Sequence, residues 1–352
     1  MVIHSAKQQS LQTLRYLVFR HSNKYFGIII LITTFAPSIK KNMATSKKED
    51  IATSTRLLPG QGPEANHINT KVKAAKQGEV SDIKVKNKNK AQEVEPIILV
   101  TNDDGVTAPG IAALVDSVRG LGKIVVIAPD KAQSGMGHAI TIGSPLRMTR
   151  VHVFGDDIES YSCNGTPVDC VKLAVDKILH RKPDICISGI NHGANHSINV
   201  IYSGTMSAAL EASIESIPSI GFSILDYSLE ADFTGPKKYA RLLVEQILNG
   251  KHLDKHLCLN VNFPAVSEKV LKGLKICRQA YAKYEESFFE RIDPHGKKYY
   301  WLTGEFVNFD RGRDTDVWAL NHNYASVVPV QFDLTHYKLK EKLENSFNLT
   351  LK

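Results

Sequence analysis

Two adjacent carboxylates, Asp103 and Asp104, follow a short apolar run in this sequence of 352 residues. Side-by-side carboxylates repel each other unless a cation or bound protons compensate their charge. Ser134 and Asn191 come shortly after two other apolar runs, and the four side chains together offer the all-oxygen ligand set that Mg²⁺, Mn²⁺ and Ca²⁺ prefer. Acids at strand ends also cap the next helix, and we expect one of the pair to do so. The residue types therefore predict a divalent metal site.

Three glycine-containing turns accompany the acid pair. They are Ser134-Gly135-Met136-Gly137, Asn164-Gly165-Thr166 and Ser203-Gly204-Thr205, and the last two lead into predicted helices. A helix N-terminus built from small residues exposes backbone N–H groups to an anion such as phosphate. Each turn alone is explained by local geometry, but their combination with a metal-type acid pair indicates a phosphoester substrate.

The turn after the first apolar run excludes two rival chemistries. It reads Asn102-Asp103-Asp104-Gly105, so the dinucleotide-binding GxGxxG pattern is absent. A phospho-aspartyl mechanism would need a nucleophilic Asp at position 102, which is Asn. A water activated by the metal is therefore the expected attacking group, and His138 or His192 could transfer a proton.

The elements that must position these residues alternate along the chain. Continuous apolar runs predict strands buried on both faces of a parallel sheet, and amphipathic segments between them predict helices. Pro109 suits the first turn of a helix, and Thr166 with Asp169 resembles a capping box. The predicted strands are 97–100, 123–128, 184–190, 219–225 and 257–261, and the predicted helices begin at Pro109 or span 166–180, 204–216 and 237–248. This order predicts a doubly wound α/β fold whose ligand crevice lies at the carboxyl ends of the strands.

The remaining segments give the predicted domain organisation. Residues 140–161 alternate apolar and polar side chains and predict a β-hairpin outside the main pattern. Beyond Cys277 the pattern becomes irregular, which we interpret as a smaller β-rich arm followed by a last helix at 334–343. We expect a disordered basic extension at 1–95, a catalytic core at 96–270, and an arm with a C-terminal segment at 271–352.

The charge of the chain is concentrated at its start. The composition, 43% hydrophobic and 23% charged, is that of a globular protein. Residues 1–95 hold 16 of the 44 Lys and Arg residues but 7 of the 36 acids, which leaves 28 and 29 in residues 96–352. The net charge of +8 therefore belongs to the extension and does not predict a nucleic-acid-binding fold. A basic tail that binds nucleic acid remains an alternative.

The compartment is predicted from the apolar run and the cysteines. The run at 25–35 is about half the length of a membrane helix, so we expect no membrane anchor, with a signal peptide or translation from Met43 as alternatives. The five cysteines form no CxxC pair, and three of them lie in or beside apolar runs, as small core residues do. A reducing, cytoplasmic location fits this pattern.

At these same residues the sequence resembles the SurE family of 5′-nucleotidases. The matching segments are Val100–Gly110, Ala128–Gly135, Asn164–Cys170, Ser188–Asn195, Tyr202–Ala209, Gly312–Trp318 and Ala325–Pro329. The resemblance covers residues 96–337 and leaves the extension unexplained.

The resemblance implies a metal-dependent phosphatase that acts on nucleoside 5′-monophosphates, and also on 3′-monophosphates and short polyphosphate. One Mg²⁺ or Mn²⁺ would be held by Asp103, Asp104, Ser134 and Asn191, with Asp103 or Asp104 acting on the water. The residues expected to line the phosphate and nucleotide are Asn164, Gly165, Thr166, Ser203, Gly204 and Thr205. The implied fold is a Rossmann-like domain with an arm and an exchanged C-terminal helix in a homodimer or homotetramer.

One feature departs from the family pattern. Lys131 is followed by Ala132 and Gln133, where some members carry a further basic residue. The preferred base or leaving group is therefore open. The rival interpretation is a non-catalytic nucleotide-binding regulatory module, because a fold and phosphate-binding loops do not by themselves imply hydrolysis.

Overall fold

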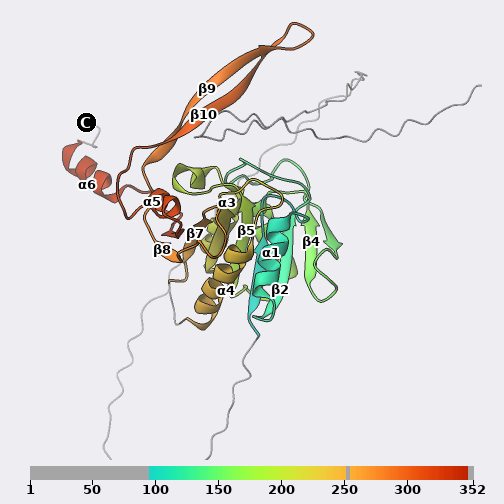
Figure 1. The fold of residues 1–352 in the computed structure, drawn as a ribbon. Coiled ribbons are helices and arrows are strands. Elements are labelled where there is room, and N and C mark those ends of the chain that lie inside the picture. Colours follow the sequence, from blue (N-terminus) through green and yellow to red (C-terminus); the bar gives the residue numbers. More distant parts are fainter. Residues whose placement is uncertain (1–94, 251–253, 348–352) are drawn as a thin grey trace, which may run out of the picture. The chain divides into compact units, whose positions relative to one another are not determined.

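The computed structural model describes residues 95–250 and 254–347 (Figure 1). The apolar run at 25–35 and the rest of the predicted extension, apart from its last residue, lie outside the described residues. Within the described part, no helix is long and apolar enough to cross a membrane.

One mixed, mostly parallel sheet of nine strands forms the framework, in the order β3-β4-β2-β1-β5-β6-β7-β11-β8. Six neighbouring pairs are parallel, while β3 runs antiparallel to β4 and β11 runs antiparallel to β7. The strands are β1 (Ile97–Thr101), β2 (Lys123–Pro129), β3 (Met148–Val151), β4 (Glu159–Cys163), β5 (Ile185–His192), β6 (Ser219–Ile224), β7 (Cys258–Phe263), β8 (Leu274–Ile276) and β11 (Ala325–Pro329). The predicted α/β class is confirmed.

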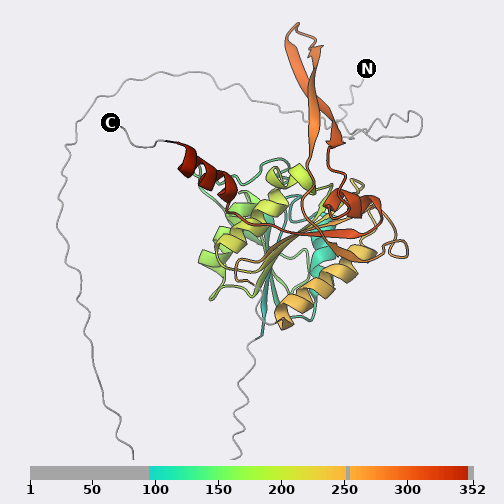
Figure 2. The same ribbon diagram turned by 90° about the vertical axis from the view of Figure 1, so that its left-hand side faces the viewer.

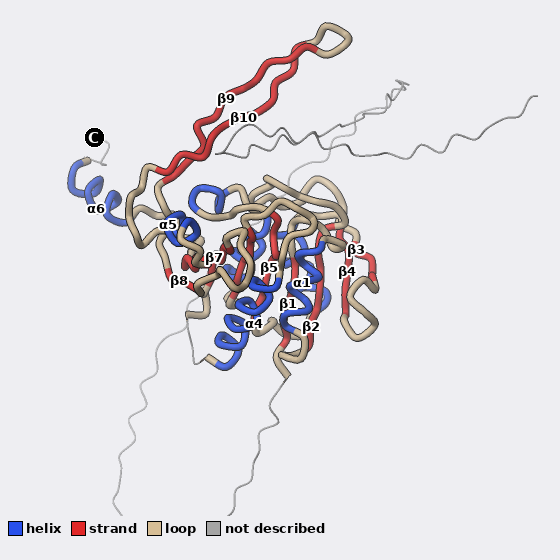
Figure 3. Tube along the Cα trace, viewed as in Figure 1, coloured by secondary structure: helices blue, strands red, loops and turns tan. Residues whose placement is uncertain are grey.

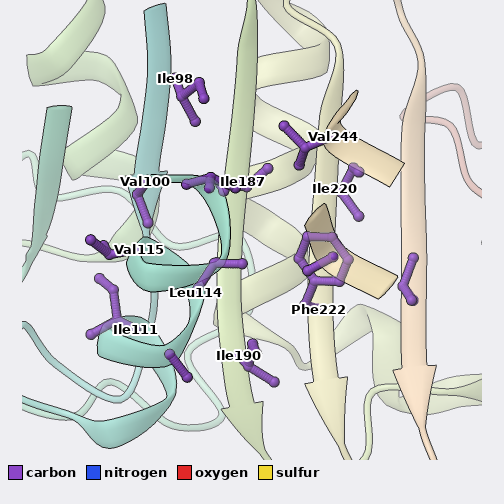
Figure 4. Close-up of a cluster of buried hydrophobic side chains, with 14 of the residues drawn as sticks. Ile98, Val100, Ile111, Leu114, Val115, Ile187, Ile190, Ile220, Phe222 and Val244 are labelled. Carbon is purple, nitrogen blue, oxygen red and sulfur yellow. The ribbon is translucent and has the colours of Figure 1, made fainter. Parts of the chain in front are cut away.

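Helices cover both faces of this sheet (Figure 2), because its central strands carry apolar side chains on both sides. On one face, α1 (Pro109–Val118) and α4 (Thr234–Asn249) pack against alternate side chains of β1, β5 and β6 (Figure 4). On the other face, α2 (Pro167–Leu173) and α3 (Gly204–Ile214) cover the intervening side chains, such as Leu99 and Cys186. Each of these helices follows a strand of the sheet in the chain, so its N-terminus lies toward the carboxyl ends of the strands.

Local sequence signals set several helix ends. The Thr166 hydroxyl accepts from the backbone N–H of Asp169 while the Asp169 carboxylate accepts from the N–H of Thr166, so the predicted capping box is present. The α-helix that follows ends at Leu173 and continues as a π-helical turn over Ala174–Ile178, so the predicted helix stops short of residue 180. Ser203 caps α3 by accepting from the N–H of Met206.

The segment predicted as a separate hairpin is part of the main sheet. Strands β3 and β4 pair antiparallel, as expected for 140–161, but β4 also pairs parallel with β2. Residues 140–147 form neither helix nor strand. The hairpin therefore extends the sheet edge instead of standing apart from it.

The chain beyond residue 270 contributes to both the sheet and an arm. Strands β9 (Ala282–Ile292) and β10 (Lys298–Asn308) form a two-stranded antiparallel arm that projects from the domain (Figure 3), where an irregular β-rich arm was predicted. Strands β8 and β11, however, complete the nine-stranded sheet. The predicted core boundary at residue 270 is therefore wrong, because β11 pairs with β7 and β8 pairs with β11.

Two helices follow the arm. Helix α5 (Asp316–Asn321), which the sequence analysis did not predict, begins with Thr315 as its cap. Helix α6 (Tyr337–Ser346) starts three residues later than the predicted 334–343 segment, and none of its residues is buried.

Candidate functional site

The acid pair lies in a tight turn directly after β1. The Asn102 side chain closes this turn, since its Nδ2 donates to the Gly105 carbonyl at 2.9 Å and its Oδ1 accepts the Gly105 N–H at 3.2 Å. Gly105 has φ of +103°, a conformation that side-chain-bearing residues rarely adopt. Asn102 and Gly105 thus shape the backbone that presents Asp103 and Asp104.

Asp103 is pressed against the N-terminus of α3. Its side chain is 5% exposed and its Oδ1 accepts a short hydrogen bond from the Thr205 hydroxyl. Burial, and secondly the neighbouring charge of Asp104, raise the pKa of Asp103 to about 7. The carboxylate is therefore held in a place where its negative charge is poorly compensated by the protein.

Asp104 turns toward β5 on the other side. Its Oδ2 accepts the backbone N–H of His192 at 3.1 Å, and burial raises its pKa as well. The N-cap of α1 is Ala108, with no side-chain hydrogen bond. The expectation that one of the two acids caps this helix is therefore wrong, because both carboxylates are used to bridge β1 to other elements.

Asn191 in β5 and Ser134 in the loop after β2 each neighbour a residue that is hydrogen-bonded to the acid pair. The Asn191 Nδ2 donates to the Gly193 carbonyl at 2.9 Å, so its Oδ1 is not used in this bond. The N–H of Gln133 donates to the Asp103 carbonyl at 2.7 Å, so the exposed Ser134 follows a residue bound to the acid turn. All four predicted ligands thus lie on segments that join at Asp103 and Asp104.

This donor set fits a hard divalent cation. Burial raises the pKa values of both carboxylates, and the segments bonded to their turn carry the Asn191 amide and the Ser134 hydroxyl. Oxygen ligands of this kind suit Mg²⁺ or Mn²⁺. Within the described residues, no three His, Cys, Asp or Glu side chains gather as a metal-binding group. A cation here would therefore depend on the adjacent acids and on neutral oxygens.

The two predicted phosphate-binding turns differ in how their backbone N–H groups are used. In the first turn, the N–H groups of Asn164, Gly165 and Thr166 donate to the Arg147 carbonyl, the Cys163 sulfur and the Asp169 carboxylate. The Thr166 hydroxyl donates to the Ala139 carbonyl. This turn therefore has its donors engaged within the protein, which the sequence pattern alone did not reveal.

The second turn remains available to an anion. Among the described residues, no hydrogen bond from the N–H groups of Ser203 or Gly204 is found. Both residues are buried beside Asp103, at the N-terminal end of α3. The positive end of that helix dipole thus faces Asp103.

The two histidines considered for proton transfer lie elsewhere. His138 Nε2 is 2.8 Å from Oε2 of the buried Glu211. His192 places its ring edge-to-face against Phe233, with 5.4 Å between ring centroids, and burial lowers its pKa. Only the backbone N–H of His192 contacts the acid pair.

A buried polar network that the sequence analysis missed fixes the loop after β5. The Asn195 N–H donates to Asn262 at 2.8 Å, its Nδ2 donates to Ser223 at 2.8 Å, and Asn260 donates to its carbonyl at 2.7 Å. Alternating Asn residues at 260 and 262, within an apolar strand, were the available signal. The network fastens the loop between Asn191 and Ser203 to β6 and β7.

Comparisons with known proteins agree with this arrangement. The family model described as "Survival protein SurE" matches residues 98–286. The chain is 58% identical over 251 residues to the "5′-nucleotidase SurE" of Flavobacterium psychrophilum, covering 71% of this chain and 97% of that protein. It is 57% identical over 257 residues to the protein of the same name from Christiangramia forsetii, covering 72% and 98%.

A solved structure supports the same assignment. The crystal structure of the SurE protein from Aquifex aeolicus has a TM-score of 0.62 and 39% identity, over 71% of this chain and 99% of that one. With the family model, the curated relatives and this structure in agreement, the chain belongs to the SurE family.

Proposed function

We propose that this protein is a 5′-nucleotidase that hydrolyses nucleoside 5′-monophosphates to nucleoside and phosphate with one bound Mg²⁺ or Mn²⁺. The observation that carries the proposal is the pair of adjacent carboxylates, with Asp103 buried against the N-terminus of α3 and Asp104 half-buried beside β5. This pair of carboxylates would repel an anionic ligand, whereas a cation bound between them would attract both the carboxylates and the ligand. The names of the curated relatives support the nucleotide substrate.

Each residue of the site would have a distinct role in the reaction. Asp103, Asp104, Ser134 and Asn191 would hold the cation, which supplies charge that polarises the phosphate and activates a water. The free N–H groups of Ser203 and Gly204 would donate to the phosphoryl oxygens, where negative charge must be stabilised. Thr205 orients the Asp103 carboxylate through its hydroxyl. Asp104, the less buried acid, would orient the attacking water and accept its proton.

The wider substrate range and assembly belong to the same proposal. We include 3′-monophosphates and short polyphosphate as further substrates, since the proposed phosphate contacts are to the phosphoryl group alone. We also propose a cytoplasmic homodimer or homotetramer in which the exposed helix α6 is exchanged between copies. Residues 96–352 carry 28 basic and 29 acidic residues, which favours a small substrate neutralised by a metal over a nucleic-acid partner.

Phosphate release from a panel of nucleotides tests the activity. Wild type should release phosphate from nucleoside 5′-monophosphates with Mg²⁺ or Mn²⁺ and stop in excess EDTA. Asp103→Asn and Asp104→Asn should each lower turnover by about 1,000-fold or more, in the range of losing one preorganised catalytic group. Asp116→Asn, on the surface of α1, removes an acid outside the site and should leave turnover intact.

The rival function, a non-catalytic nucleotide-binding module, predicts a different outcome. In that case nucleotides bind to wild type but are recovered intact with either metal. Full activity of either acid variant, or activity that persists in EDTA, would contradict the proposed mechanism.

A further inference from the structure

The loop that carries Ser134 lacks secondary structure of its own. Residues 131–147 form no helix or strand, and most of them are exposed. Such a loop can hold a metal ligand in place only if other groups fix it. Two buried carboxylates, Asp169 of α2 and Glu211 of α3, contact this loop.

Asp169 accepts two hydrogen bonds from the loop residue Thr141. Its Oδ1 accepts the Thr141 N–H at 3.0 Å and its Oδ2 accepts the Thr141 hydroxyl at 2.6 Å. Burial raises the pKa of Asp169, but hydrogen bonds from Thr141 and Thr166 outweigh burial and leave this pKa below its usual value. Asp169 is therefore a buried carboxylate whose acceptors are used on the loop and on its own helix.

Glu211 contacts the loop at His138, which is nearer to Ser134 in the chain than Thr141 is. It is 3% exposed, accepts from His138 Nε2 at 2.8 Å, and forms an ion pair with Lys172 of α2. Glu211 lies on α3, the same helix whose first turn contacts Asp103. Through Glu211 the loop and both helices are joined at one buried carboxylate.

Ser134 lies in the loop between the acid turn and the residues that Asp169 and Glu211 hold. On one side of Ser134, Gln133 is bound to the Asp103 carbonyl; on the other, the Gly137 N–H donates to the Tyr202 carbonyl at 3.1 Å and His138 is held by Glu211. Ser134 thus lies in a short span fixed at both ends. Backbone hydrogen bonds fix the two ends of this span, and the two carboxylates hold the part of the loop that follows it, at His138 and Thr141.

We infer that Asp169 and Glu211 are positioning residues of the metal centre, which hold Thr141 and His138 so that the Ser134 hydroxyl stays within reach of the cation. This inference rests on the proposed function, since it assumes that Ser134 is a ligand. It also gives the Asn164–Asp169 turn a role, because this turn binds loop residues with its donors. The turn would then act on the metal through the loop and not on the phosphate directly.

Variants at the loop end of each contact test the inference. Asp169 also caps α2 and Glu211 also pairs with Lys172, so changing either acid could unfold the helices. Thr141→Val removes the hydroxyl donor and leaves the backbone N–H bonded to Asp169, and His138→Ala removes the imidazole. Thr141→Ser and His138→Gln retain these side-chain donors and serve as conservative rescues. Glu215→Gln, at the exposed end of α3 and paired with Lys182, is the matched control.

Mn²⁺ affinity of the full chain, measured by calorimetry, is the readout, together with the turnover at saturating Mn²⁺. Each disruptive variant should raise the Mn²⁺ Kd by about tenfold or more, as loss of ligand-orienting partners does, with turnover at saturating Mn²⁺ changed much less. Thr141→Ser, His138→Gln and Glu215→Gln should keep the wild-type Kd within about threefold, well inside that shift.

Three results would overturn or separate the two proposals. If both disruptive variants had a lower unfolding temperature but an unchanged Mn²⁺ Kd, the contacts of Asp169 and Glu211 with the loop would have only a structural role. That result would defeat the inference. Wild type that binds neither Mn²⁺ nor Mg²⁺ would defeat both the inference and the proposed function. Wild type that binds Mn²⁺ but releases no phosphate would defeat only the proposed function, and the Kd values of the variants would still decide the inference.

Discussion

A Cβ atom placed on Gly204 would lie 2.7 Å from the Cβ of Asp103. This close approach lets the first turn of α3 reach the carboxylate, so that Thr205 can donate its hydroxyl to Asp103. A larger residue at position 204 is excluded by lack of space and not by the backbone angles. Its Cβ would collide with the Cβ of Asp103, which cannot move away because it is attached directly to the backbone.

Gly204→Ala should therefore disturb the site. We expect a loss of stability of about 1–3 kcal/mol from overpacking and a fall in kcat/KM of about 100-fold, because displacements of about 1 Å at a reacting centre have effects of that size. Phosphate release and thermal unfolding measure the two effects. Gly143→Ala, where the added Cβ meets nothing within 4 Å, is the control. Wild-type kcat/KM in Gly204→Ala would show that α3 need not abut Asp103.

Divalent metal should stabilise the folded chain. A ligand that binds only the folded state adds about 2.7 kcal/mol of unfolding free energy when present at 100 times its Kd, so Mn²⁺ should raise the unfolding temperature and EDTA should reverse this. Asp103→Asn should lose the Mn²⁺ effect. In EDTA at pH 8, this variant should be at least as stable as wild type, because its neutral amide removes the repulsion with Asp104. Equal Mn²⁺ stabilisation of wild type and Asp103→Asn would count against the ligand assignment.

The central part of the fold could be predicted because its signals are local. Strands such as β1 and β5 are continuous apolar runs, and Pro109 and Thr166 mark helix starts in the sequence itself. Strand β8, with three residues, and β11 join the sheet through pairing with segments distant in the chain. Nothing within a three-residue window encodes such pairing, so the boundary at residue 270 was misplaced.

The site shows the same limit at the level of side chains. The rule that ligands gather at carboxyl ends of parallel strands sufficed to predict that the turn of Asp103 and Asp104 meets the end of β5, which also carries Asn191. It could not separate the turn at Asn164-Gly165-Thr166 from the turn at Ser203-Gly204-Thr205, because both read as small residues before a helix. The two turns differ in whether their N–H groups already have acceptors. In the first turn, acceptors from other segments, such as the Arg147 carbonyl, are bonded to these N–H groups.

Removing the basic extension should leave catalysis intact. A chain that starts at Gln92, where a separate compact unit begins, lacks 16 of the 44 basic residues and 5 of the 36 acidic ones. Its kcat/KM for a nucleoside 5′-monophosphate should equal that of the full chain, because the site residues all lie beyond position 102. Any salt-dependent DNA binding by the full chain should be lost, since such binding follows the number of basic contacts. DNA binding retained by the shorter chain would place that activity in the folded part.

Stability should fall on acidification through His196. Its ring is 8% exposed and packs edge-to-face on Phe306, and burial lowers its pKa although the charge of Asp316 opposes this shift. The unfolded chain therefore binds this proton more readily than the folded one, so the contribution to stability is present above about pH 6.5, the ordinary His pKa, and is lost as the pH falls below it.

His196→Leu removes this titration while keeping the position apolar. Between pH 7 and 5.5, wild type should lose about 1 kcal/mol of unfolding free energy relative to the variant, within the limit of about 1.4 kcal/mol per pH unit for one proton. Denaturant unfolding at several pH values measures the difference, and the offset at pH 8, where His is neutral in both states, isolates the packing effect of the substitution. Parallel stability curves for the two proteins would show that His196 takes up its proton equally well in the folded and unfolded states.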